Sequence, residues 1–260
     1  MSEPDAWAAL RRLTSARIAL GRTGVSVPTD RALEFQAAHA AARTAVHEPL
    51  DAPALAQSLS PAFSGTDIVR TMAPDRATYL RRPDLGRRLA EGAGDALLSP
   101  PADIAVVVVD GLSARAVTAH AAPFLEALLP RLDEGGYSRT PLTVVLEGRV
   151  AVGDEIGAAR GAAMTVMLIG ERPGLSAADS LGVYLTYGPQ PGRRDNDRNC
   201  ISNIREGGLS YEQAAYRAHY LIHEAMRRKL TGVALKDDTA APAGLTAGSP
   251  AFLLPNHRTI

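Results

Sequence analysis

The sequence predicts an α/β protein, in which a mostly parallel sheet is covered by helices and follows a helical N-terminal region. In the segment 103–109, Asp103 is followed by a continuous apolar run rich in valine, which is typical of a strand buried on both faces. After residue 101, such runs alternate with helical patterns, which favours parallel strands joined by helices. We therefore expect a helical region over 1–100, an α/β domain over 101–235 and a flexible tail over 236–260.

The first hundred residues carry apolar side chains at helical spacing. This spacing predicts a short helix over 6–13 and a longer one that starts at Thr29 or Asp30, one of which would be its N-cap, and stops before Pro49. Residues 51–75 are interrupted by prolines and a glycine, so we expect short helices and loops there. A further helix is expected over 84–98.

The α/β domain is expected to alternate in chain order. The predicted strands are 103–109, 142–146, 163–169 and 182–187, and the predicted helices are 113–132, 154–160 and 209–230. Ser113 and Ser210 precede two of these helices and are good N-cap residues. Residues 188–200 are polar and rich in glycine, proline and arginine, which predicts a loop.

Composition excludes several classes of protein. The chain has 260 residues, with 28 Lys and Arg balanced by 28 Asp and Glu, and a nucleic-acid binder usually has a basic excess. Cys200 is the single cysteine, so no intrachain disulfide can form, and we expect a reducing compartment. We expect no signal peptide and no membrane span, because the apolar runs are far shorter than the roughly 20 residues that a span requires.

Several familiar motifs are missing from the sequence. No Gly-x-Gly-x-x-Gly follows the first predicted strand and no phosphate-loop lysine motif occurs, which makes a nicotinamide-dependent dehydrogenase improbable. His219 and His223 share a helix face, but two ligands do not complete a zinc site, so we expect no bound metal. Gly153, Gly157 and Gly161 recur every four residues, which favours close packing of a helix on the sheet.

Polar segments follow the strands of the predicted sheet. Glu171 comes directly after the third strand, residues 148–150 follow the second, and residues 197–204 follow the fourth. Ligands of open α/β sheets bind outside the carboxyl ends of the strands, so we expect these segments to meet there. The structural alternative for Glu171 is an exposed turn residue. Six arginines between 70 and 88 predict either a solvated helix face or a contact with an anion or another subunit.

Five segments carry a family resemblance. They are residues 14–22, 79–88, 109–113 (Val-Asp-Gly-Leu-Ser), 170–175 (Gly-Glu-Arg-Pro-Gly-Leu) and 200–204 (Cys-Ile-Ser-Asn-Ile). In this order and spacing, the chain to about residue 235 resembles the small (light) subunit of ethanolamine ammonia-lyase. The last three segments are specific in combination, whereas any one alone would be a weak signal.

The resemblance implies a carbon–nitrogen lyase that converts ethanolamine to acetaldehyde and ammonia with adenosylcobalamin. It implies a Rossmann-like domain in this chain, a β/α-barrel large subunit that holds the substrate and most catalytic residues, and a hexamer of such heterodimers. Cobalamin would lie between the subunits, and this chain would be inactive alone. The resemblance also implies a bacterial microcompartment or, if the enzyme is not encapsulated, the cytoplasm. The chain starts close to the matched N-terminal helix, without the extension that some members carry, which puts encapsulation in doubt.

Three residues match the family's cobalamin contacts. The resemblance implies that Val150 packs on the corrin, that Glu171 accepts hydrogen bonds from the amides around its rim, and that Cys200 packs on the cofactor. It assigns no catalytic residue to this chain. No Asp-x-His-x-x-Gly occurs, so the cofactor is expected to keep its own dimethylbenzimidazole ligand. The alternative is a stand-alone α/β module that binds a corrinoid or a nucleotide without a catalytic partner.

Overall fold

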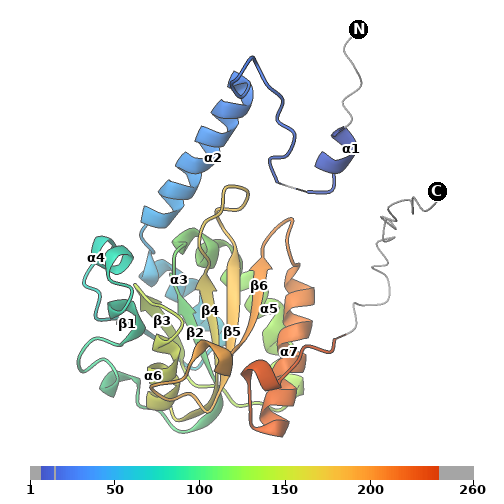
Figure 1. Cartoon of the computed structure of the whole chain (residues 1–260). Coiled ribbons are helices and arrows are strands. Elements are labelled where there is room, and N and C mark those ends of the chain that lie inside the picture. Colours follow the sequence, from blue (N-terminus) through green and yellow to red (C-terminus); the bar gives the residue numbers. More distant parts are fainter. Residues whose placement is uncertain (1–6, 15, 240–260) are drawn as a thin grey trace, which may run out of the picture.

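A computed structural model describes residues 7–14 and 16–239, and a single six-stranded sheet organises most of them (Figure 1). The strand order is β1-β3-β2-β4-β5-β6, with parallel pairing from β1 to β4 and antiparallel pairing of β4 with β5 and of β5 with β6. The strands are β1 (Thr66–Arg70), β2 (Ala102–Val109), β3 (Leu142–Leu146), β4 (Ala162–Gly170), β5 (Leu181–Tyr187) and β6 (Asn199–Ile204). The predicted α/β class with a mostly parallel sheet is confirmed.

Helices lie on both faces of this sheet. The α-helices are α1 (Ala8–Arg11), α2 (Thr29–His47), α3 (Ala52–Leu59), α4 (Arg76–Arg81), α5 (Ala114–Glu134), α6 (Val152–Ala159) and α7 (Tyr211–Arg228). Single 3₁₀ turns are η1 (Ser60–Ala62), η2 (Leu85–Arg87), η3 (Asp95–Leu97), η4 (Asp195–Asp197) and η5 (Gly232–Ala234). Helices α5 and α7 pack on one face, and α6 packs on β2 and β4 from the other.

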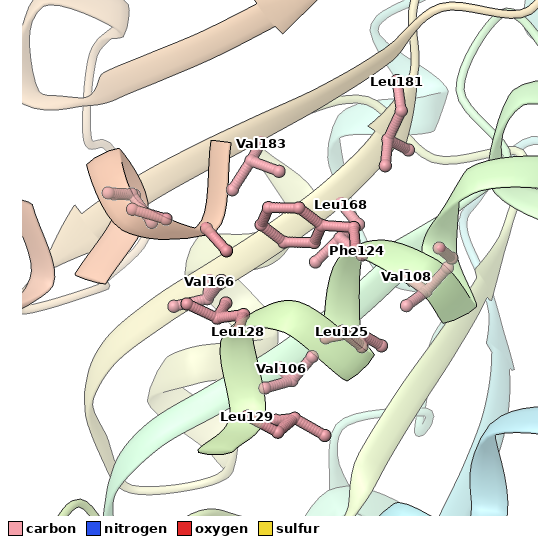
Figure 2. Close-up of a cluster of buried hydrophobic side chains, with 14 of the residues drawn as sticks. Val106, Val108, Phe124, Leu125, Leu128, Leu129, Val166, Leu168, Leu181 and Val183 are labelled. Carbon is pink, nitrogen blue, oxygen red and sulfur yellow. The ribbon is translucent and has the colours of Figure 1, made fainter. Parts of the chain in front are cut away.

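The larger core lies between α5, α7 and the sheet (Figure 2). Phe124 and Leu128 of α5 point toward alternate residues of the central strands, among them Val166 and Leu168. All four side chains are completely buried. Burial of one such side chain contributes about 1.5–3 kcal/mol, so this layer is the main source of stability.

The opposite face has a smaller core under α6, and glycine makes its close packing possible. A Cβ atom at Gly153 would lie 2.6 Å from Cε of Met167, and one at Gly157 would overlap Thr165 and Pro189. The predicted helix–sheet packing role is therefore confirmed for these two glycines. Gly161 is different, because it follows the helix and adopts a left-handed conformation with φ +62°.

The predicted caps have mixed outcomes. Ser113 caps α5 by accepting a hydrogen bond from the Ala116 N–H, and Ser210 caps α7 in the same way from Gln213. The predicted cap at Thr29 or Asp30 is wrong, because α2 has Pro28 at its N-cap and Thr29 is already helical.

Three expectations about individual elements are wrong. Residues 66–70, expected in loops and short helices, form β1 and extend the sheet beyond β3. Residues 84–98, expected to form one helix, contain only the short turns η2 and η3. Residues 199–204, expected in the polar region after the fourth strand, form β6. The predicted boundary at residue 100 stays a prediction, although β1 lies on its N-terminal side. Most of the predicted tail, residues 240–260, lies outside the described residues.

Helix α2 extends away from the sheet (Figure 1). Only Ala42 and Ala45 of this 19-residue helix are buried, whereas Leu33 and Phe35 are exposed. Across residues 7–14 and 16–239, no helix has the length and apolar character needed to cross a bilayer.

The end of β4 offers a test of packing. A Cβ atom at Gly170 would lie 2.5 Å from the Asp110 carbonyl oxygen and would overlap the Ser113 backbone. We predict that Gly170→Ala lowers the free energy of unfolding by at least about 2 kcal/mol, measured by urea denaturation. Gly174→Ala is the matched control, because its Cβ would meet only the Ala177 oxygen at 3.5 Å. Equal midpoints for the two variants would contradict the proposed backbone contact.

Candidate functional site

Loops that follow β2, β3 and β4 meet at the carboxyl edge of the sheet. The Leu112 N–H donates to the Gly170 carbonyl at 2.9 Å, which joins the β2 loop to the end of β4. Gly111 adopts φ +56° and has the Gly170 backbone where its Cβ would be, so only glycine fits at this crossing. The edge where ligands bind in open α/β sheets is therefore formed by close backbone contact.

A cavity of about 310 Å³ lies at this edge. Val150 and Glu171, predicted as site residues from two different strands, both line it, together with Tyr184 of β5. The expectation that the segments after the second and third strands meet is confirmed. Arg149 and Tyr79 complete one wall, with the Arg149 guanidinium 4.4 Å from the centre of the Tyr79 ring.

Glu171 is half-buried and held by its neighbours, so the interpretation as a simple exposed turn residue is wrong. Its Oε2 accepts hydrogen bonds from the Ser180 hydroxyl at 2.5 Å and from the Asn203 N–H at 3.3 Å. Its backbone N–H donates to the Ser180 carbonyl at 2.9 Å. Oε1 makes no hydrogen bond within the described part of the chain and faces the open side of Gly182. One carboxylate oxygen is thus available to a ligand.

Cys200 lies on β6, directly opposite Tyr184 of β5. Their neighbours Val183 and Ile201 point into the larger core, so Tyr184 and Cys200 point to the other face of the sheet. Helix α6 covers this face only over β2 and β4. Over the outer strands β5 and β6, Tyr184 is half-buried and Cys200 is exposed. Desolvation raises the pKa of the Cys200 thiol, while its contact with the Ser202 hydroxyl at 3.3 Å acts in the opposite direction. The thiol is therefore protonated at neutral pH.

Only one end of the polar segment 197–204 reaches the site. Strand β6 runs parallel to β4, so it begins at the far edge of the sheet and ends near Glu171. Asn203 contacts Glu171, whereas Arg198 at the other end is buried in a two-bond ion pair with Asp154 of α6, at 2.6 and 2.7 Å. The expected convergence of the whole segment is therefore wrong for its N-terminal end, where Arg198 binds Asp154.

A buried charge cluster lies beneath the cavity. Asp110, directly after β2, accepts hydrogen bonds from the N–H groups of Glu147 and Gly148 at 2.9 and 3.1 Å. Arg76 of α4 contacts the Asp110 carboxylate at 3.4 Å and the Glu147 carboxylate at 3.1 Å. Because two buried carboxylates share one guanidinium, desolvation and then repulsion from Glu147 raise the Asp110 pKa to about 7.

Glu147 has a strained backbone that the same cluster supports. Its φ of +58° is unusual for a residue with a side chain. Its N–H donates to Asp110, its carbonyl accepts from the Thr71 hydroxyl at 2.8 Å, and its carboxylate accepts from Arg76. This turn leads to Arg149 and Val150, which line the cavity.

One arginine of the arginine-rich segment, Arg76, has a role that neither sequence interpretation described, whereas the other five are exposed to solvent. Arg76 is mostly buried and binds carboxylates of the same chain, so it is neither on a solvated helix face nor free for an external anion. Arg82 and Arg88 form exposed ion pairs with Asp84 and Glu155.

A second polar cluster holds the loop that carries Glu171. Buried His120 of α5 contacts the Tyr211 hydroxyl at 2.9 Å and the Asp179 carboxylate at 3.3 Å. The Ser113 hydroxyl donates to the Ala178 carbonyl at 2.9 Å. The loop between β4 and β5 is therefore attached to both α5 and α7.

Metal ligands do not cluster in the described part of the chain, where no three His, Cys, Asp or Glu side chains could hold an ion together. His223 contacts the Tyr137 hydroxyl at 3.1 Å, and burial lowers the pKa of His219. The His223 contact is of the structural kind expected from the sequence.

Sequence reasoning missed Asp110, Tyr184 and the His120 cluster. A signal for Asp110 was present, because an acid directly after a strand buried on both faces must find partners. Tyr184 and His120 carry no such signal, because their partners are remote in sequence. Tyr184 lies opposite Cys200 of β6, a strand that was not predicted, and His120 contacts Tyr211 of α7.

The chain is similar to one family over almost its whole length. The family described as ethanolamine ammonia-lyase light chain matches residues 4–236. The ethanolamine ammonia-lyase small subunit of Azotobacter vinelandii is 53% identical over 95% of both chains. The small subunits of Xanthomonas campestris and Ralstonia nicotianae are 51% and 52% identical, with 96% of both chains covered in the first and 95% and 94% in the second.

The charge cluster predicts a pH dependence of stability. The Asp110 pKa is about 7 in the folded chain and 3.8 in the unfolded chain, so the folded state binds more protons between these values. The contribution of Asp110 is complete below about pH 3.8 and is lost as the pH rises through 7. We predict that Asp110→Asn removes a decline in unfolding free energy on the order of a few kcal/mol between these limits. Urea denaturation across this range measures it, and equal slopes for variant and parent would refute it.

Proposed function

Because this chain belongs to the ethanolamine ammonia-lyase light-chain family, it is a lyase subunit that works with a large subunit, and we propose that it binds one side of the cobalamin cofactor. The convergence of Val150 and Glu171 on one cavity, with Tyr184 and its cross-strand partner Cys200 beside it, is the observation that carries this proposal. These residues come from four different parts of the chain. Family membership also favours a subunit over a stand-alone module or a dehydrogenase.

The residues present fit a corrinoid in their chemistry. A corrin ring is broad and largely apolar, and neutral amide groups surround its rim. Val150 and Ile169 offer apolar surface in the cavity, and Oε1 of Glu171 is an acceptor for an amide N–H. The cavity of about 310 Å³ is far smaller than a cobalamin, so this chain can enclose only one edge of it. The remaining wall would come from the large subunit.

Each residue has a limited task in this proposal. Ser180 and Asn203 hold Oε2 of Glu171, which fixes the carboxylate and leaves Oε1 free to accept a hydrogen bond from the ligand. The protonated thiol of Cys200 packs as a small apolar group and does not react. Adenosylcobalamin, when bound, supplies the homolytic cobalt–carbon cleavage that starts the radical conversion of ethanolamine to acetaldehyde and ammonia.

We propose no catalytic residue in this chain. Asp110, the acid with the most raised pKa near the cavity, is occupied by two backbone N–H groups and Arg76. The substrate and the catalytic side chains would belong to the large subunit. The hexamer of heterodimers and the location in a microcompartment or the cytoplasm follow from the resemblance alone and stay predictions.

Reconstitution tests the proposed function. The purified chain, a large subunit, ethanolamine and adenosylcobalamin are mixed, and both acetaldehyde and bound cobalamin are measured. We expect activity and tight cobalamin binding only when both subunits are present. Equal binding and activity by the large subunit alone would overturn the proposal.

Glu171 gives the sharpest single-residue test. We predict that Glu171→Ala weakens cobalamin binding by the assembled complex about 5- to 150-fold, because it removes a buried hydrogen-bond acceptor. Glu171→Gln, which keeps an oxygen of similar position, should lose less. Glu126→Ala is the control, because Glu126 is an exposed glutamate of α5, the helix that packs on the other face of the sheet. An unchanged dissociation constant for Glu171→Ala would remove this residue from the site.

Cys200 separates packing from chemistry. We predict that Cys200→Ser changes cobalamin affinity less than Glu171→Ala does and leaves turnover of the reconstituted complex close to that of the parent. The physical reason is that serine keeps the size of the side chain and only the apolar contact is weakened. Loss of turnover with unchanged cobalamin binding would show that the thiol reacts.

A further inference from the structure

A second cavity of about 400 Å³ adjoins the first. It lies between the end of α2 and the loops after β3 and β4, and the two cavities share Leu112, Arg149 and Arg172 as lining residues. Arg43 of α2 lines it as well. Three arginines from three separate segments therefore surround one space.

These arginines have no counter-charge. No Asp or Glu lines the cavity. Within residues 7–14 and 16–239, the side chains of Arg43, Arg149 and Arg172 form neither a hydrogen bond nor an ion pair, and Nε of Arg149 is buried without a partner. Arg43 and Arg172 are exposed and Arg149 is half-buried, whereas the fully buried guanidinium groups of Arg160 and Arg198 are paired with Asp67 and Asp154.

The walls of this cavity are held in place. Near the end of α2, the Val46 carbonyl accepts a hydrogen bond from Nε of Arg76 at 2.8 Å, and Glu48 pairs with Arg115 at 2.8 Å. The Arg149 N–H donates to the Gly86 carbonyl at 2.7 Å, and its guanidinium stacks on Tyr79. The Arg149 charge is thus fixed before any ligand arrives, which lowers the entropic cost of binding an anion.

We propose that this cavity binds a phosphate ester. Guanidinium groups present paired donors that match phosphate oxygens, and repulsion among three unpaired cations is relieved when an anion binds. The main molecule that would carry this phosphate is cobalamin, through the phosphodiester of its nucleotide tail, and in this respect the proposal rests on the proposed function. The two cavities would then bind different parts of one ligand. Glu171 in the first cavity accepts hydrogen bonds from the neutral amides, and the arginines of the second cavity bind the anionic tail. A free phosphate compound is the other source of the same chemistry.

The first arm of the test compares two corrinoids on the assembled complex. Cyanocobalamin carries the nucleotide tail, and dicyanocobinamide lacks it. For Arg43→Gln and Arg172→Gln we expect a loss of about tenfold in cyanocobalamin affinity, and cobinamide affinity within about twofold of the parent. Arg227→Gln, an exposed arginine of α7 paired with Glu224, is the matched control and should change neither.

The second arm uses inorganic phosphate and pyrophosphate, titrated by calorimetry into the complex without corrinoid. Binding that the arginine variants lose, with no discrimination between the two corrinoids, assigns the cavity to a free phosphate compound. Equal losses for both corrinoids, or no loss for either, together with no arginine-dependent phosphate binding, would overturn the proposal. If the parent complex binds neither corrinoid, the proposed function fails, and this arm still decides the phosphate cavity.

Discussion

The buried carboxylate of Asp110 is the contact on which the site depends. It follows the central strand β2, accepts two N–H groups from the turn after β3, and faces Arg76 from α4. Arg76 also donates to the Gly111 carbonyl at 2.8 Å and to Val46 at the end of α2. A charge in an apolar interior is costly unless it is paired and hydrogen-bonded. The end of β2, the turn after β3 and helix α4 must therefore meet at this cluster. The cavity adjoins it, because Arg76 contacts the lining residues Gly111 and Tyr79.

The same constraint explains why an irregular segment is so well placed. Residues 71–98 contain little regular structure, yet the Tyr79 hydroxyl donates to the Gly148 carbonyl at 2.8 Å and the Tyr79 ring is completely buried. A Cβ atom at Gly86 would lie 2.8 Å from that ring. This segment forms the wall against which Arg149 stacks. Its order comes from buried polar contacts rather than from helix or strand propensity.

The change from parallel to antiparallel pairing after β4 has a functional consequence. A parallel strand requires a crossover helix, and that helix would cover the sheet. Strand β5 is antiparallel to β4 and to β6, so neither connection needs a crossover helix. On this face α6 covers only the inner strands β2 and β4. The outer face around Tyr184 and Cys200 is thus available to a ligand and a second subunit. In the proposed function this face supplies one half of the cofactor site, and the large subunit supplies the other half.

The sequence by itself determined the strands β2 to β5, the helices α5 and α7 with their serine caps, and the position of Glu171 and Val150 after two of these strands. These features depend on local patterns, namely β-branched runs, helical periodicity and cap residues. Only the tertiary structure decided that β1 and β6 join the sheet, because their polar residues become strands by pairing with β3 and β5. It also decided that Arg76 is buried and that Arg43, Arg149 and Arg172 surround one cavity. Whether a charge is paired or free depends on neighbours that are remote in sequence.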